Sequence, residues 1–281
     1  MKRAIVSLIA VLSLLSCKRL VFEDRTNCPS YMYFDVLNDE MFNTEDGVYA
    51  TVLSYPKRQA MDAAVTSISQ MKETEPLTRF HFLIRGTEAV TGYGLLGYGQ
   101  LERNGSEWTA ARGRDFTSLF RFSYIADVQE ESFTVPVEFV KEYSRIRVQF
   151  VGYEDELGEV YFPYDVVVRG KTSGIDALTG TPVLGDFEYS CLAEEDGRYA
   201  FNLPRQGDTS LGLYLFGIDA ITENYTLAAS FSLYDILSEQ GGVTWQEKNL
   251  PDVDITIDYQ QRVVEVKVSD WYSDDNLSYE W

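Results

Sequence analysis

The sequence has only one histidine and three cysteines among its 281 residues. So few nitrogen and sulfur ligands exclude most zinc and redox centres, which need several such side chains. Basic residues are also scarce, because 24 Lys and Arg stand against 44 Asp and Glu, giving a formal net charge of −20. A chain this acidic lacks the basic patches that neutralise phosphates. We therefore expect no metal, no cofactor and no nucleic-acid partner.

The apolar run at residues 4–15 is too short to cross a bilayer, since a spanning helix needs about 20 apolar residues. Lys2 and Arg3 precede this run, and Ser16-Cys17 follows it. Positive residues, a short apolar run and then a cysteine are typical of a bacterial lipoprotein signal. We expect residues 1–16 to be removed and Cys17 to carry the acyl chains that anchor the protein. A plain secretory signal with an incidental cysteine is the alternative.

Two cysteines remain after export. An envelope compartment permits disulfides, so Cys28 and Cys191 could form a bridge. The alternative is two separate buried thiols, because the sequence does not place their Cα atoms within bonding range. Cys28 falls in the polar stretch 17–30, which we interpret as a lipidated tether.

Apolar residues that alternate with polar ones dominate the rest of the chain. Period-two alternation predicts strands with one buried face, which is typical of antiparallel sheets. Turn signals such as Asn104-Gly105 and Asp196-Gly197 separate the alternating runs. The runs cover residues 31–36, 80–85, 120–124, 133–139, 145–150, 199–203, 211–215, 227–233, 252–259 and 264–268.

Helical signals occur in only two places. Apolar residues at three- and four-residue steps predict one helix within residues 58–73, and a second short helix is expected near 232–238, ending at Gly241. The first prediction depends on Met61, Ala64, Val65, Ile68 and Met71.

Many short strands with few helices predict β-sandwiches, and the length suits two domains. We therefore predict a mainly β chain whose two domains comprise residues 31–142 and 143–281.

No stretch has the pattern of a catalytic site. The single histidine, His81, is placed on the outward face of a predicted strand, and no nucleophile turn is present. The acidic clusters 154–156, 194–196 and 274–276 fall in predicted turns and lack the spacing of a calcium loop. The glycine-rich stretch 92–99 lacks the strand-then-helix setting of a dinucleotide loop, so a strand with bulges or close packing suits it better. We expect no catalytic residue and no enzymatic activity.

Four stretches together resemble a known family. They are Cys17 with Glu23-Asp24-Arg25-Thr26-Asn27-Cys28-Pro29, the aromatic-glycine strand 92–100, the strand 144–150, and the ending 250–271. In this order they are similar to the minor and anchor subunits of Bacteroidales fimbriae, the fimbrillin-like lipoproteins. The segment 56–79 has no counterpart in that family pattern.

The resemblance implies two transthyretin-like antiparallel β-sandwich domains in series. It also implies a lipid-anchored outer-membrane protein, displayed at the cell surface, that acts as a fimbrial anchor or accessory subunit and supports adhesion. Its expected partners are other fimbrial subunits, joined by β-strand exchange, in which a strand of one subunit completes a sheet of another.

A surface glycan-binding lipoprotein is the alternative function. Such a protein would expose a row of Trp or Tyr rings on which sugars can stack. The candidates are Trp108, Trp245, Trp271 and Trp281, although Trp271 follows an alternating strand and is expected in the core.

Overall fold

The computed structural model describes residues 29–54, 59–72, 82–85, 89–127, 132–152, 162–218, 224–258 and 263–269. Several residues singled out in the sequence lie outside these ranges, among them Cys17, Cys28, His81, Trp271, Trp281 and the acidic clusters 154–156 and 274–276. No helix within the described ranges combines the length and apolar character needed to cross a membrane.

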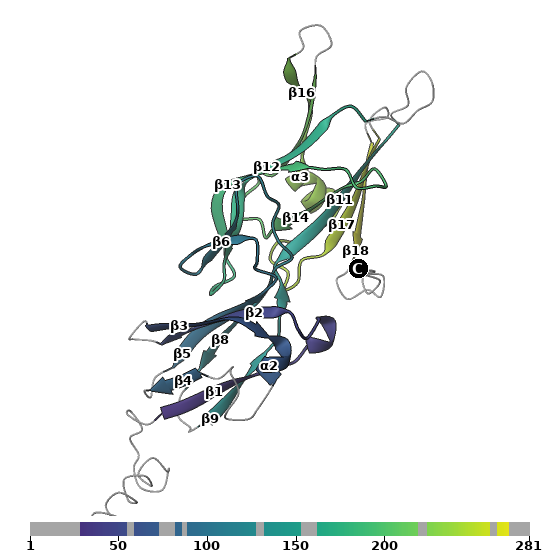
Figure 1. Cartoon of the computed structure of the whole chain (residues 1–281). Coiled ribbons are helices and arrows are strands. Elements are labelled where there is room, and N and C mark those ends of the chain that lie inside the picture. Colours follow the sequence, from purple (N-terminus) through teal and green to yellow (C-terminus); the bar gives the residue numbers. More distant parts are fainter. Residues whose placement is uncertain are drawn as a thin grey trace, which may run out of the picture. The chain divides into compact units, whose positions relative to one another are not determined.

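Strands make up most of the described chain, which confirms the mainly β prediction (Figure 1). Contacts group the residues into two compact units. The first unit comprises Met1–Gly94 with Phe122–Glu138, and the second comprises Leu95–Arg121 with Phe139–Trp281. Residues 95–121 therefore belong with the second unit, although the sequence placed them before the expected boundary at residue 142.

The first unit contains a three-stranded sheet in the order β4-β1-β9 and a second sheet with the order β8-β5-β2-β3. Its short helices are η1 (Asp39–Met41) and α2 (Ile68–Lys72). The strands are β1 (Pro29–Val36), β2 (Gly47–Ser54), β3 (Gln59–Ser67), β4 (Phe82–Arg85), β5 (Val90–Leu96), β8 (Phe120–Ala126) and β9 (Ser132–Val137).

The second unit contains a four-stranded sheet, β14-β11-β17-β18, and a six-stranded sheet built on β16-β15-β12-β7-β6, with β13 paired to β12. Its two-residue strand β10 (Val140–Lys141) pairs with the first two residues of β8. The remaining strands are β6 (Leu101–Asn104), β7 (Glu107–Ala110), β11 (Tyr143–Val151), β12 (Asp165–Asp176), β13 (Pro182–Cys191), β14 (Tyr199–Pro204), β15 (Gly212–Ile218), β16 (Tyr225–Ser232), β17 (Asp252–Asp258) and β18 (Val263–Ser269).

Most strand pairs are antiparallel, as predicted, but each unit also contains one parallel pair. In the first unit β1 runs parallel to β9, and in the second unit β11 runs parallel to β17. Each parallel pair joins the unit's early strand to one much later in the chain. Alternation along a strand does not report its direction, so these two pairs could not be predicted.

The two sheets of the second unit enclose one hydrophobic core. The inward residues of β11, β14 and β17 alternate as predicted, and they meet Val166, Val168, Leu213 and Leu215 of the six-stranded sheet. The outward residues Arg145 and Arg147 are only partly buried. The alternation along β11 and β17 therefore predicted the buried face of each strand.

A helical segment closes part of this core. It consists of α3 (Leu233–Asp235) and the π-helix η2 (Ile236–Gln240), which confirms the helix expected near residues 232–238. Ser232 caps it by accepting a hydrogen bond from the Asp235 backbone N–H at 3.3 Å, and Gly241 follows its last residue. Leu233, Ile236 and Leu237 are buried in the core cluster.

The helix predicted within residues 58–73 is wrong for most of its length. Residues 59–67 form β3, which pairs with β2 from Gly47↔Ser67 to Ser54↔Gln59, and only α2 is helical. Ile68 and Met71 of α2 are buried. Backbone pairing with β2 outweighed the local three- and four-residue spacing, because tertiary context overrides weak intrinsic preferences.

The glycine-rich strand β5 allows close packing of aromatic rings in the first unit. A Cβ on Gly92 would overlap the Thr51 carbonyl oxygen and the Tyr124 hydroxyl, and one on Gly94 would overlap the Phe122 ring. The Tyr124 hydroxyl instead donates to the Thr51 carbonyl at 3.1 Å. This agrees with the close packing expected for residues 92–99.

Gly92→Ala should destabilise the first unit by about 3 kcal/mol or more, because the added methyl group would force the β2 backbone and the Tyr124 ring to move. Gly99→Ala is the matched control, since a Cβ there meets no atom within 4 Å. Urea denaturation of both variants measures the difference, and equal stabilities would contradict the packing argument.

Candidate functional site

Strand exchange requires a sheet edge that can accept another strand. In the second unit, β14 and β18 are the outer strands of the four-stranded sheet, and β16 and β6 are the outer strands of the six-stranded sheet. Within the described ranges, no further strand pairs with the outer edge of β16 or β18, and both of these strands carry apolar residues that pack against the core but stay partly exposed. These two edges are the candidate subunit-binding site.

The edge strand β18 pairs along its whole length with β17, from Asp252↔Ser269 to Asp258↔Val263. Its Val264 and Val266 pack against the core but are only partly buried. Glu265 and Lys267 are exposed. The core is therefore incompletely covered at this margin, and a strand added here could bury more of the two valines.

The edge strand β16 has apolar residues on both of its faces. Ala229 and Phe231 pack against the core from one side while staying partly exposed. On the other face Leu227 lies opposite Phe216, and Tyr225 lies opposite Ile218.

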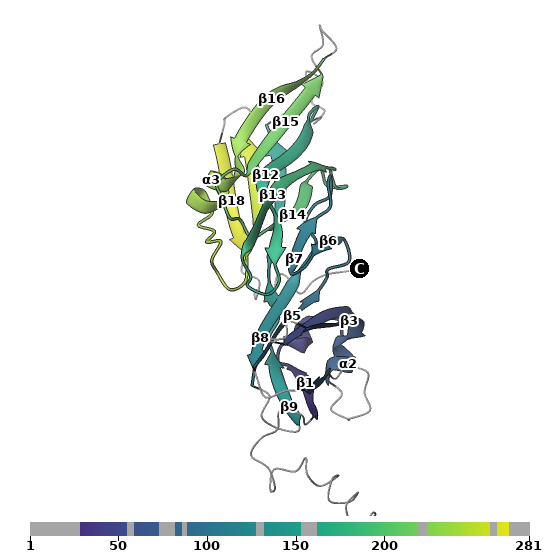
Figure 2. The ribbon, with the colours of Figure 1, turned by 90° about the vertical axis from the view of Figure 1, so that its left-hand side faces the viewer.

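The segment α3-η2 lies against β15, the neighbour of the edge strand β16, and against the edge strand β18 itself. It follows β16 directly in the chain, and η2 contacts β18 (Figure 2). Its buried Leu233, Ile236 and Leu237 fill the margin of the core that a sandwich leaves open between its two sheets. A partner strand would therefore meet a margin of the core that is already partly closed by this segment.

A buried ion pair holds the start of β17, on which β18 depends. The Lys141 ammonium is fully buried, lies 2.5 Å from an Asp252 carboxylate oxygen, and donates to the Leu250 carbonyl at 3.1 Å. The same carboxylate oxygen accepts from the Arg145 backbone N–H at 2.9 Å. Burial lowers the pKa of Lys141, and the negative charge of Asp252 opposes that shift.

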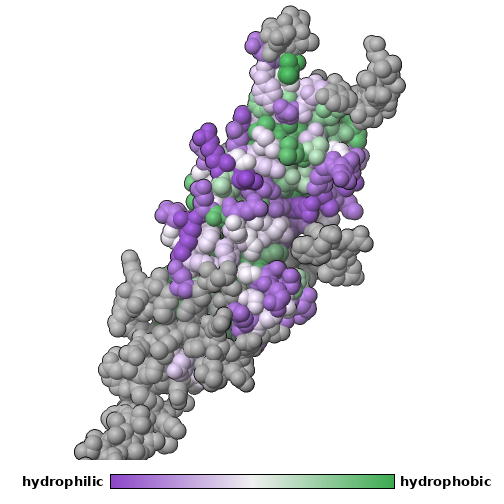
Figure 3. All heavy atoms as spheres, viewed as in Figure 1, coloured by the Kyte–Doolittle hydropathy of each residue, from purple (hydrophilic) through white to green (hydrophobic). Residues whose placement is uncertain are grey.

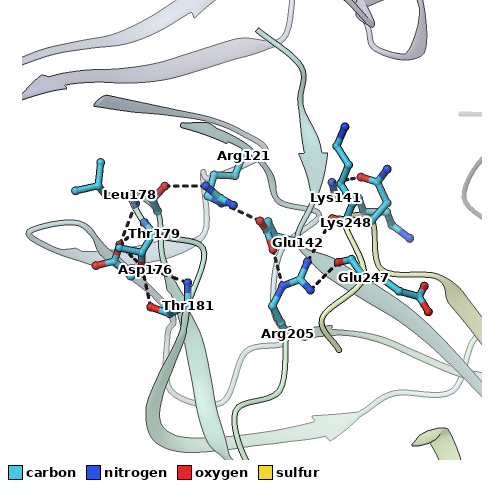
Figure 4. Close-up of polar contacts among 12 residues, drawn as sticks. Arg121, Lys141, Glu142, Asp176, Leu178, Thr179, Thr181, Arg205, Glu247 and Lys248 are labelled. Atoms are coloured by element: carbon cyan, nitrogen blue, oxygen red, sulfur yellow. Dashed lines mark hydrogen bonds and ion pairs between the residues drawn. The ribbon is translucent and has the colours of Figure 1, made fainter. Parts of the chain in front are cut away.

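The neighbouring Glu142 carboxylate joins two arginines (Figure 4). It is almost fully buried, and it accepts from Arg121 at 2.8 Å and from Arg205 at 2.9 Å. Arg205 also donates to the backbone carbonyls of Trp245 and Glu247, in the loop that leads to β17. The network ties the start of β11 and the end of β14 to that loop.

Arg121 links this network to a tight turn after β12. It donates to the Ala177 carbonyl at 3.4 Å, and the Asp176 carboxylate accepts from the Thr179 backbone N–H (Figure 4). The Ser106 hydroxyl also donates to the Asp176 carboxylate, at 2.7 Å. Burial alone would raise the pKa of Asp176, but these hydrogen bonds outweigh it and lower the pKa.

The sequence did not single out Lys141, Glu142, Asp252 or Arg205. Two adjacent charges, Lys141 and Glu142, follow the apolar residues Phe139 and Val140, and this was the only feature of the sequence that could have pointed to a buried ion-pair network. Each finds its partner at least 21 residues away along the chain. Such pairings depend on the fold, so the residues alone could not identify them.

Two of the four candidate tryptophans can be located, and both are buried. Trp108 lies in β7, and Trp245 donates its ring N–H to Ser238 at 3.3 Å. The prediction of an exposed tryptophan row is wrong for these two residues, because strand pairing and the Arg205 loop turn them inward. Trp271 and Trp281 lie outside the described ranges.

Cys191 ends β13 and is buried in the core of the second unit. Burial raises the pKa of the Cys191 thiol well above its usual range, which makes the thiol unreactive. Since Cys28 lies outside the described ranges, the bridge between the two stays a prediction.

Within the described ranges, no group of His, Cys, Asp and Glu side chains is suited to hold a metal ion. The acidic residues 194–196 lie exposed in a turn, as expected. The polar contacts around Glu142 and Lys141 are ion pairs and hydrogen bonds to backbone carbonyls, which support structure.

No family model and no curated protein sequence matches the chain. Solved structures do match it. A "putative adhesin" from Bacteroides ovatus superposes with a TM-score of 0.56 at 11% identity, covering 87% of this chain and 94% of that one. The fimbrial anchor protein Mfa2 from Porphyromonas gingivalis gives 0.54 at 10% identity, covering 87% and 98%. The chain shares their fold.

A third structure from Bacteroides thetaiotaomicron, described among "putative polysaccharide binding proteins", gives a TM-score of 0.55 at 12% identity, covering 89% of this chain and 99% of that one. Each match covers nearly the whole of the known chain. The similarity therefore extends over both compact units, although identities this low concern the fold alone.

Glu142→Gln should destabilise the protein by about 3–5 kcal/mol, because two buried guanidinium groups lose their carboxylate. Glu188→Gln is the control, since it breaks the exposed pair with Arg169 and should change stability by less than about 1 kcal/mol. Chemical denaturation measures both values. A Glu142→Gln protein as stable as the control would show that the buried network contributes little.

Proposed function

We propose that this chain is a non-enzymatic lipoprotein of the bacterial surface that acts as a fimbrial anchor or accessory subunit and supports adhesion. The single observation that carries the proposal is the pair of edge strands β16 and β18, which flank one core and leave its apolar margin partly exposed. The shared fold with Mfa2 and with the "putative adhesin" supports the same role.

The binding mode is the addition of a partner strand to one of these edges. Backbone N–H and C=O groups along an edge supply the hydrogen bonds, and alternate side chains of the added strand supply specificity. Val264 and Val266 of β18, and Ala229 and Phe231 of β16, are partly buried, and an added strand would bury more of their apolar surface. The partners are other fimbrial subunits.

The membrane attachment is the lipid on Cys17, followed by the tether 17–30 and two transthyretin-like sandwiches, one for each compact unit. This places the protein on the outer membrane at the base of a fimbrium. The support comes from the sequence pattern at Lys2-Arg3, residues 4–15 and Cys17.

Cys17→Ala should release the protein from the membrane fraction, because the acylated thiol is the proposed anchor. Immunoblots of membrane and soluble fractions measure the distribution, with Cys191→Ala as a control that should stay membrane-bound. A Cys17→Ala protein that remains in the membrane fraction would contradict lipid anchoring.

A photo-crosslinking amino acid placed at Lys267 of β18 or at Thr226 of β16 should capture a fimbrial shaft subunit in intact cells, since both positions are exposed on edge strands. Glu195, in an exposed turn, is the control position and should give no such product. Mass spectrometry of the crosslinked band identifies the partner and the edge.

Deletion of the gene in a strain without a paralogue should release or lengthen its fimbriae. Electron microscopy of the cells tests this. Unchanged fimbriae, together with no crosslink from either edge, would rule out the subunit role.

A further inference from the structure

A groove of about 840 Å³ lies on the six-stranded sheet of the second unit. Such a volume is within the range of small-ligand sites. The proposed role in fimbriae does not use this groove. Its lining includes residues from the five strands β6, β7, β12, β13 and β15 and from the segment after β7, among them Arg112, Arg169, Lys171, Asp186, Glu188 and Tyr214.

The groove arises because the hydrogen-bond ladder along one edge of β12 is interrupted. On that edge β15 pairs with Asp165–Arg169 and β7 pairs with Gly174–Asp176. Between them Lys171 donates its backbone N–H to the Ser210 hydroxyl at 2.8 Å instead of to a strand. On the opposite edge, the pairing with β13 shifts register between Gly170 and Gly174. Bulges of this kind often lie beside binding sites.

Charged side chains of both signs line the groove, and their charges cancel. The lining contains Arg112, Arg169 and Lys171 together with Glu102, Asp186 and Glu188, which gives a net charge of zero (3 − 3). Arg169 pairs with Glu188 at 2.7 Å, and Lys171 pairs with Asp186. Such pairs present donors and acceptors side by side, as a ligand rich in hydroxyl groups requires. An anionic ligand would find no excess of positive charge here.

Aromatic rings continue from the groove along the same outward face. Arg169 lies 5.5 Å from the Tyr214 ring centroid and 5.1 Å from that of Phe216. Tyr225 stacks on Phe216 at 5.3 Å with an interplanar angle of 12°, and its hydroxyl donates to Asp165 at 2.7 Å. These contacts fix the orientation of the rings before any ligand arrives.

The end of this row is open to solvent. Tyr225 is 55% exposed, and its neighbours Ile218 and Leu227 are 73% and 52% exposed. Figure 3 shows hydrophobic residues among hydrophilic ones at the end of the unit that carries β16. An outward sheet face is usually polar, so an aromatic row beside a charge-balanced groove is unusual for a merely solvated face.

We propose that the groove and the row formed by Tyr214, Phe216 and Tyr225 bind a neutral oligosaccharide. Ring hydroxyls of the sugar exchange hydrogen bonds with the Arg169–Glu188 and Lys171–Asp186 pairs, and the apolar faces of the sugar pack against the exposed part of the row. Because the row extends beyond the groove, the ligand is an oligosaccharide rather than a single sugar. This site goes beyond the assembly role proposed above and does not depend on it.

The full mature chain, purified in detergent, is applied to an array of neutral and anionic oligosaccharides, and calorimetry then measures the Kd for the strongest neutral ligand. Tyr225→Ala should weaken binding about tenfold through the lost ring surface. Arg169→Met keeps the stem over the rings but removes the donors, so it should weaken binding at least about tenfold. Leu192→Ala is the matched control, because Leu192 is 79% exposed and does not line the groove.

Neutral-sugar binding that Tyr225→Ala and Arg169→Met both weaken and the control retains would support the site, provided that all variants unfold at the same urea concentration. Binding to no array member, binding to anionic sugars only, or equal affinities in all variants would overturn it. If the same two variants instead abolish copurification of a fimbrial subunit, the face is a protein interface and the proposal also fails. Membrane release and edge crosslinking test the assembly role separately.

Discussion

Two adjacent buried charges, Lys141 and Glu142, join segments of the second unit that are distant in sequence, and the position of the edge strand β18 depends on them. Lys141 forms an ion pair with Asp252, the first residue of β17. Glu142 forms ion pairs with Arg121 of β8 and with Arg205, which follows β14. Four segments that are distant in sequence therefore meet at two adjacent buried charges. Removing either charge would leave its partner buried without compensation, which is costly in a low-dielectric interior. The position of β17, and with it the edge strand β18, depends on this arrangement.

The buried ion pairs of Lys141 and Glu142 hold the strand β17, against which the proposed binding edge β18 is paired. Among the described strands, β18 pairs only with β17, and its inward valines lie at the margin of the core that α3-η2 partly fills. An edge of this kind can accept a strand, provided that its own position is rigid. The outward face of the other sheet differs, because its interrupted ladder leaves a charge-balanced groove beside ordered rings. One unit thus offers an edge for protein binding and a separate face for a polar ligand.

Local patterns were reliable where burial alternates along a strand. The outward Arg145 and Arg147 and the buried Ile255 were placed correctly, because a period of two is imposed by strand geometry. The same reasoning failed at residues 58–73, where a helical spacing was read from residues that pair with β2. Trp108 and Trp245, which were candidates for sugar stacking only as aromatic residues, are buried. Spacing alone does not show whether a segment will pair with a neighbouring strand.

The amino-acid sequence by itself therefore determined a mainly β chain, the buried faces of its strands and the short helix near residue 233. Only the tertiary structure decided that β11 runs parallel to β17, that Lys141 meets Asp252 across 111 residues, and that, among the described strands, none pairs with the β15 edge of β12 beside Lys171. The physical reason is the range of the interactions. Alternation follows from the backbone geometry of a few neighbouring residues, whereas pairing partners and ion pairs are selected by the packing of the whole core.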